Sequence, residues 1–128
     1  MATPGEHIRE ADANARRAST LEQAGDAWEI VLLFYSSLHL VQAYLYTKTP
    51  RFHADDHVGI AKAIAASPEV KHMAGPYRAL RELSQQVRYD PAFVATDRHR
   101  VDSRKHPATV DNATRPKVAK WLAAQSPP

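Results

Sequence analysis

The chain has 128 residues, and its 17 Lys and Arg against 14 Asp and Glu give a formal net charge of +3 with histidine neutral. This length suits a single domain with a modest core, and a hydrophobic share of 44% argues against wholesale disorder. Because the chain has no cysteine, a disulfide framework, a thiolate metal site and a cysteine nucleophile are excluded.

The positive charge is concentrated in the second half of the chain. Residues 1–64 carry six Lys and Arg and eight Asp and Glu, a net −2, whereas residues 65–128 carry eleven and six, a net +5. A surface that binds polyanions is therefore expected in the second half, although small proteins also show such asymmetry by chance. The N-terminus has no apolar leader segment, and polar side chains interrupt the apolar run over residues 28–46. We therefore expect a soluble, cytoplasmic protein without a membrane span.

Two helices are predicted in the first part of the chain. Thr3 and Glu6 have the spacing of a capping box, and an apolar stripe carries the first helix to about residue 22. After a tight link, Asp26 and Glu29 form a second capping box that opens a helix over residues 26–47. The two helices should pack as an antiparallel hairpin. The second helix is apolar on most faces, which is typical of a central helix or of a subunit interface.

Shorter elements follow in the middle of the chain. A helix is predicted over residues 57–66, with another turn starting at Ser67. Pro76 starts the next helix, which extends to about residue 88 before Asp90 and Pro91 stop it.

The last part of the chain is predicted to be less regular. Residues 92–113 have no sustained apolar period, so we predict a long basic loop, and loops of this length are usually functional or disordered. Thr114 caps a final helix over residues 115–125, and residues 126–128 form a disordered tail. Residues 1–125 are thus predicted to form a single all-α domain.

Arginines of the fourth predicted helix are spaced so that they lie along one stripe. Arg78, Arg81 and Arg88 follow one another at helical spacing. Together with basic residues of the predicted loop they form either a phosphate-binding surface or a solvated helix face. The basic residues of the loop are Arg98, Arg100, Arg104 and Lys105.

Several histidines are candidates for chemistry. His39 lies among apolar side chains, where a neutral imidazole with one hydrogen bond to a neighbouring helix is favoured over a general base. Arg100 and His106 have the spacing of a pair that cleaves RNA without metal: the histidine moves the 2′-hydroxyl proton and the arginine stabilises the phosphorane charge. His53 and His57 flank two aspartates and resemble a metal site only loosely, so neither a metal nor a cofactor is expected.

Residues of the second and fourth predicted helices resemble those of HEPN domains. The resemblance covers residues 4–91 and is carried by an aromatic and histidine segment, by a histidine in the following loop, and by a Tyr-Asp-Pro stop. These residues are Trp28, Phe34, Tyr35, His39, Tyr44, His53, Tyr77, Leu80, Leu83, Ser84, Arg88, Tyr89, Asp90 and Pro91. The resemblance implies an up-and-down bundle of four or five helices and a homodimer with a cleft at its two-fold axis. Many such proteins are metal-independent endoribonucleases of prokaryotic toxin–antitoxin and defence systems.

This sequence departs from the motif of the active HEPN proteins, in which an arginine is followed by a histidine on one helix. Ser84 stands at the place of the arginine and Tyr89 at the place of the histidine. No catalytic residue is therefore assigned, and the fallback candidates are His39, Arg88, Tyr89, Arg100 and His106.

The predicted function is an RNA- or nucleotide-binding module of a prokaryotic defence or stress system, without the nuclease activity of the family. One alternative is a metal-independent endoribonuclease toxin, and another is a protein-interaction partner that uses the surface of the second helix. The predicted nucleic-acid-binding residues are Arg78, Arg81, Ser84, Arg88, Tyr89, Arg98, Arg100, Arg104 and Lys105.

Overall fold

The structure is a computed structural model that describes residues 2–23, 26–49 and 57–125. Over these ranges the chain forms helices and turns, without a strand, which confirms the predicted all-α bundle. The elements in chain order are α1 (Pro4–Gln23), α2 (Glu29–Lys48), α3 (His57–Ala65), the 3₁₀ turn η1 (Lys71–Met73), α4 (Ala74–Tyr89) and α5 (Asp97–Gln125).

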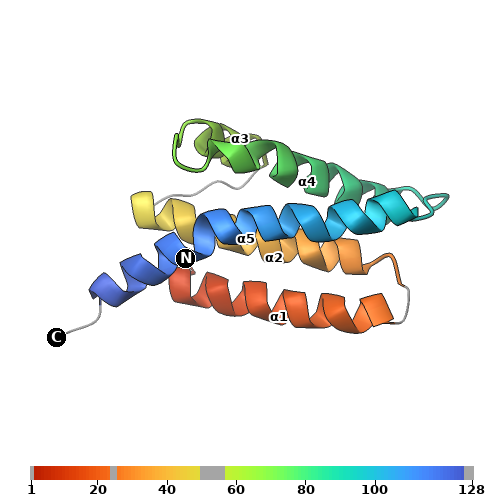
Figure 1. Cartoon of the computed structure of the whole chain (residues 1–128), viewed down its shortest axis with the longest axis horizontal. Helices are drawn as coiled ribbons and strands as arrows, with labels where there is room; N and C mark the ends of the chain where they lie inside the picture. The colour runs from red at the N-terminus through yellow and green to blue at the C-terminus, as the bar shows by residue number, and fades with distance from the viewer. Residues whose placement is uncertain (1, 24–25, 50–56, 126–128) are drawn as a thin grey trace.

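The four long helices alternate in direction, as in an up-and-down bundle (Figure 1). The α1 helix lies at one side, α2 and α5 lie in the middle, and α4 lies at the opposite side with the short α3 helix (Figure 1). The α2 helix packs against α1, α4 and α5. Eleven of its twenty residues are buried, because a helix that is apolar on most faces needs partners on most sides.

The helix starts follow the predicted capping patterns only in part. At the start of α1, the Glu6 amide donates to Thr3 Oγ1 at 3.2 Å, and the Thr3 amide donates to Glu6 Oε1 at 3.3 Å. Before α2, Asp26 Oδ1 accepts a hydrogen bond from the Trp28 amide at 2.9 Å, but the Glu29 carboxylate binds an arginine of α5 instead of closing the box. The first capping box is confirmed, and the second is wrong, because Asp26 binds the amide of Trp28, the residue before α2, and Glu29 does not bind the Asp26 amide.

The predicted long loop over residues 92–113 is wrong, because α5 begins at Asp97 and continues to Gln125. A reciprocal cap starts this helix: the His99 amide donates to Thr96 Oγ1, and the Thr96 amide donates to His99 Nδ1, both at 3.1 Å. This is a capping box with histidine in place of the usual glutamate or glutamine. Pro107 lies inside α5, where it has no amide hydrogen for the carbonyl four residues earlier, and the helix continues past it.

The α5 helix has no continuous apolar stripe, and contacts with other helices stabilise it instead. Val110, Ala113 and Val118 are buried in the core. Ion pairs then tie the helix to α1 and α2, and they are Arg100–Glu29, Arg104–Glu22 and Arg115–Asp12. The helix thus depends on partners distant in sequence, which a search for local periodicity does not detect.

The α2 helix is the one described helix that is long and apolar enough to cross a membrane, and 56% of its apolar window is buried inside the bundle. Core helices of soluble proteins have the same composition, which agrees with the soluble protein expected from the sequence. The cytoplasmic location stays a prediction. His53 and the predicted tail over residues 126–128 lie outside the described residues.

Candidate functional site

The predicted binding residues of α4 come together with an aromatic residue of α2. Arg88 donates from its Nη1 to the Tyr35 hydroxyl at 2.9 Å, and its guanidinium carbon lies 5.6 Å from the centre of the Tyr35 ring. The same guanidinium lies 5.1 Å from the ring centre of Tyr89, whose side chain is 74% exposed. Both distances are within the range of cation–π contacts. The α4 site, as named here, consists of Tyr35, Arg81, Ser84, Arg88 and Tyr89.

The α4 site contains polar atoms that are shielded from water and have no hydrogen-bond partner among the described residues. They are Arg81 Nε, Ser84 Oγ and Arg88 Nε. Their residues follow one another at intervals of three and four along α4, so they lie on one face of the helix. A buried polar group without a partner costs about 1–3 kcal/mol. The free chain therefore has three polar atoms without hydrogen bonds on one face of α4.

A hollow of about 230 Å³ lies between α3 and α4, next to the α4 site. Arg78 and Arg81 line it from α4, together with Tyr77, while His57 and Lys62 line it from α3. The Tyr77 hydroxyl lies 3.5 Å from His57 Nδ1, and the rings of both residues pack against Phe34 of α2. Burial raises the pKa of Tyr77, so its hydroxyl stays protonated and available as a hydrogen-bond donor at neutral pH.

Among the described side chains, the two carboxylates near the α4 site form no ion pair with its arginines. Asp90 Oδ1 accepts a hydrogen bond from the Ala92 amide at 2.9 Å and so orders the turn that follows α4. Glu82 is exposed and lines the hollow between α3 and α4 beside the arginines. The α4 site thus keeps a net positive charge.

The predicted binding residues of α5 have different surroundings. Arg100 donates to the buried Glu29 carboxylate at 2.7 Å, and Arg104 pairs with Glu22 of α1. Arg98 pairs with Asp102 on its own helix, and Lys105 is exposed. Two of these four cations therefore bind carboxylates of neighbouring helices.

The histidines proposed as catalytic groups lie apart from the α4 site. His39 Nδ1 lies 2.9 Å from Nδ1 of His7 on α1, so one ring donates this hydrogen bond to the other. Burial lowers the pKa of both imidazoles, which favours the neutral form, and this is the structural interpretation that the sequence favoured. His106 lines a separate hollow of about 170 Å³ between α4 and α5, together with His99 and Asp102. Arg100 instead extends toward α2, so it and His106 face different neighbours.

Metal binding has no support among the residues that the structure describes. They contain no group of three or more His, Asp or Glu side chains arranged to hold a metal ion. His57 packs against the ring of Phe34, and its predicted companion His53 is outside the described ranges.

Sequence reasoning missed the contribution of Tyr35 to the α4 site. Its place on an apolar helix suggested a core residue, and only the register of α2 against α4 brings its hydroxyl to Arg88. Two signals in the sequence did point to Tyr35: its ring was a candidate for base stacking, and the HEPN-like segment includes it. Comparison of the chain with protein-family models, with curated proteins and with solved structures finds no match.

Proposed function

We propose that the chain is a HEPN-like module that binds RNA or a nucleotide through the α4 site and does not cleave it. The observation that carries this proposal is the guanidinium of Arg88, which lies against the exposed Tyr89 ring and on the same face of α4 as Arg81. Guanidinium donors match the geometry of phosphate oxygens. Both arginines are partly exposed, so their terminal N–H groups can reach a bound phosphate, whereas the fully buried Ser84 hydroxyl cannot.

The aromatic residues of the α4 site support a nucleic acid over a simple anion. Tyr89 is 74% exposed beside the Arg88 guanidinium, and an exposed ring next to a phosphate-binding cation offers a face for base stacking. Stacking tolerates every base, so the site is expected to bind single-stranded RNA with little sequence preference.

The surroundings of the histidines support binding without cleavage. A general base must reach the proton that it removes, either directly or through one water. His39 is engaged with His7, and His106 lies in a separate hollow on the α5 side of α4. The endoribonuclease alternative predicts cleavage of RNA by excess protein in EDTA, and we expect intact RNA in that experiment.

The binding experiment uses fluorescence anisotropy of a labelled single-stranded RNA over a range of salt concentrations. Arg88→Gln and Arg81→Gln should each weaken binding and reduce the slope of log K against log salt by about 0.7, the value for one phosphate contact on a single strand. Arg16→Gln is the matched control, because it removes an exposed charge from α1, outside the α4 site. Equal losses in all three variants would mean that only net charge matters, and the α4 site would be rejected.

Ser84 allows a test of which groups of the α4 site reach the RNA. Ser84→Ala removes a buried hydroxyl without a partner, so the free protein should become more stable. Because Ser84 is fully buried, RNA binding should stay unchanged, in contrast to Arg81→Gln and Arg88→Gln. Ser37→Ala is the matched control, since Ser37 Oγ is also buried without a partner but lies on α2 outside the α4 site.

The resemblance to HEPN domains adds two further expectations, a homodimer and a role in prokaryotic defence or stress. The alternative is a protein partner that binds the surface of α2. Little of that surface is available to a partner, because more than half of the residues of the helix are buried in the bundle. Light scattering of the purified chain tests the homodimer, and a monomer at all concentrations would contradict it.

A further inference from the structure

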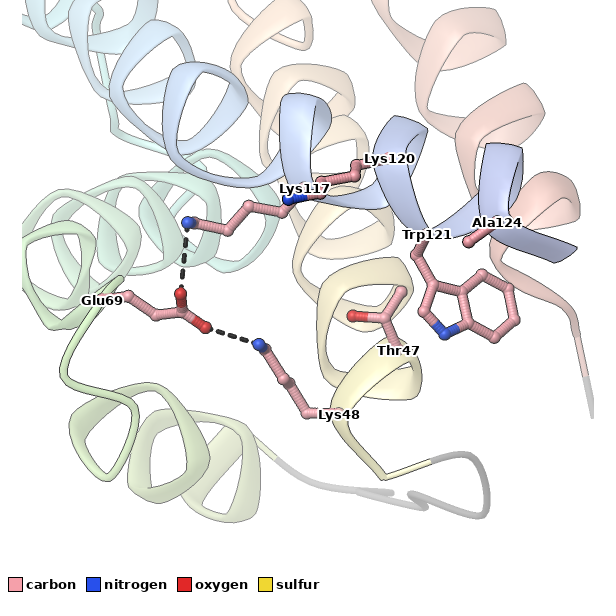
Figure 2. Close-up of a pocket in the computed structure, with 7 residues that line it drawn as sticks. All are labelled: Thr47, Lys48, Glu69, Lys117, Lys120, Trp121 and Ala124. Carbon is pink, nitrogen blue, oxygen red and sulfur yellow. Dashed lines mark hydrogen bonds and ion pairs between the residues drawn. The ribbon is translucent and has the colours of Figure 1, made fainter.

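A second hollow, of about 360 Å³, lies at the other end of α2 and shares no residue with the α4 site. It is an open hollow bordered by the end of α2, by the segment between α3 and η1, and by the last turns of α5 (Figure 2). Its volume is within the range of small-molecule pockets, about 300–1,000 Å³. The lining side chains that matter here are Thr47, Lys48, Glu69, Lys117, Lys120 and Trp121.

Glu69 pairs with two ammonium groups on one wall of this hollow. Lys48 Nζ lies 2.7 Å from Glu69 Oε1, and Lys117 Nζ lies 3.2 Å from Glu69 Oε2 (Figure 2). The buried Tyr44 hydroxyl also donates to Oε1, at 2.6 Å. The hydrogen bond from Lys48, followed by those from Tyr44 and Lys117, lowers the pKa of Glu69 to about 2. Each ammonium has three N–H groups, so both lysines keep donors for a ligand.

Lys120 and Trp121 complete the hollow from α5. Lys120 is exposed and has no ion-pair partner among the described side chains. The Trp121 indole lies beside Thr47, on the other side of the hollow from Glu69 (Figure 2). The ring of Tyr46 holds the indole edge to face, with 6.1 Å between the ring centres. Three ammonium groups and one carboxylate give the hollow a net charge of +2.

We propose that this hollow binds the phosphate monoester end of a nucleotide, with the phosphate at the three lysines and the base against Trp121. A phosphate monoester carries about −1.5 to −2 charges at pH 7, which matches the charge of the hollow. A carboxylate ligand would balance only half of that charge, and an aliphatic phosphate would leave the indole without a stacking partner. The choice of a nucleotide as the ligand rests on the proposed function, whereas the phosphate and the planar ring follow from the lining residues.

The experiment measures the fluorescence of Trp121 in the full chain carrying Trp28→Phe, which leaves Trp121 as the single tryptophan. Trp28 is 43% exposed at the opposite end of α2, so its replacement leaves the hollow intact. Adenosine monophosphate should quench the fluorescence of the indole in a saturable manner. Adenosine should bind at least about tenfold more weakly, as expected for the loss of a charge-assisted contact. Equal affinity for the two, or quenching that does not saturate, would overturn the proposal.

Lys120→Gln should weaken binding of the monophosphate severalfold and leave the weak binding of adenosine unchanged. Arg16→Gln is the control for net charge, and an equal loss in that variant would reject the hollow as a specific site. Two sources of the ligand are then distinguished with RNA that carries a 5′-phosphate or a 5′-hydroxyl. If the end of an RNA is the source, the 5′-phosphate tightens binding and Lys120→Gln removes the difference. If the 5′-phosphate has no effect while the monophosphate still binds, the source is a free mononucleotide.

The same measurements separate this proposal from the proposed function. Arg88→Gln changes RNA anisotropy if the α4 site binds RNA, but it should leave quenching of Trp121 by the monophosphate unchanged. Loss of that quenching in Arg88→Gln would overturn the second site, and absence of RNA binding together with intact quenching would reject the α4 site alone.

Discussion

Arg100→Ala is expected to lower the thermal stability of the protein strongly, because Arg100 balances a carboxylate that the bundle buries. Glu29 is 1% exposed, and its Oε1 accepts a hydrogen bond from Arg100 Nη1 at 2.7 Å. Its Oε2 is buried without a hydrogen-bond partner in the described part of the chain. Burial raises the pKa of Glu29 and the nearby Glu22 raises it further, whereas Arg100 lowers it. Without the arginine, Glu29 becomes a buried charge with little compensation.

The size of the loss follows from the burial of the pair. Removing one partner of a buried ion pair costs about 3–5 kcal/mol. The Arg100 side chain is 28% exposed, so water screens the pair in part, and we expect about 2–3 kcal/mol. The unfolding entropy of a chain of this length is about 0.27 kcal/mol/K, so Tm should fall by about 7–11 °C.

Thermal and urea unfolding followed by circular dichroism measure this loss. Arg98→Ala is the matched control on the same helix, because its ion pair with Asp102 leaves the arginine 83% exposed and should contribute less than about 0.5 kcal/mol. Replacing both members of the buried pair, in Glu29→Met with Arg100→Met, should return the stability to within about 1 kcal/mol of the parent. If Arg100→Ala costs no more than Arg98→Ala, the buried pair does not determine the position of α5 and the reasoning is refuted.

The pH dependence of Arg100→Ala provides an independent check. Loss of the arginine should raise the pKa of Glu29 further above its ordinary value of 4.5, so the folded state binds a proton that the unfolded state does not. The stability of the variant should therefore increase, relative to the parent, as the pH falls from 7 toward 4.5. A constant difference between the two proteins over that range would contradict the assignment.

The remaining predictions concern α1 and α2. Ser36→Ala should lower the free energy of unfolding by about 1 kcal/mol, because Ser36 Oγ donates to the Ala11 carbonyl at 2.8 Å. Ser37→Ala should be neutral or stabilising, because that hydroxyl is buried without a partner among the described residues. Urea unfolding of the two variants measures the difference. The stability should fall below about pH 6.5, since burial lowers the pKa of His7 and His39 and the unfolded chain takes up protons first. Urea unfolding at about pH 7.5 and 5.5 measures this fall, and replacing both histidines by glutamine should reduce it.

Local signals were sufficient for the parts of the fold that local interactions specify. The Thr3 capping box, the apolar run of α2 and the Asp90 stop are all contained in short windows of sequence, and α1 to α4 begin and end within a few residues of the predicted positions. The helical part of residues 92–113 was missed because its stabilising groups lie in other segments. Its cap uses His99 where the familiar pattern has a carboxylate or an amide, and its arginines bind carboxylates of α1 and α2.

The candidate site was also predictable only where it depends on local spacing along one helix. The spacing of Arg78, Arg81 and Arg88 placed them along one stripe of α4 without any structure. The role of Tyr35 was not predictable, because it requires the distance between two helices, and its partner Arg88 is 53 residues away in sequence. The hollow lined by Trp121 was not predicted for a similar reason, because its charge depends on tertiary contacts between Glu69 and lysines at the ends of α2 and α5.

The positive charges in the second half of the chain therefore have two different roles in the fold. On α4 the carboxylates leave the arginines uncompensated, and Nε atoms of Arg81 and Arg88 stay without partners. On the first half of α5, Arg100 and Arg104 face carboxylates of the net-acidic first half, so that charge joins the two halves of the chain. Composition measures the excess of positive charge, but only the neighbour of each cation decides whether it binds a ligand or another helix. Arg88 and Arg100, which the sequence placed in one set, should accordingly separate by experiment: loss of the first should chiefly weaken RNA binding, and loss of the second should chiefly lower stability and leave RNA binding by the folded protein unchanged.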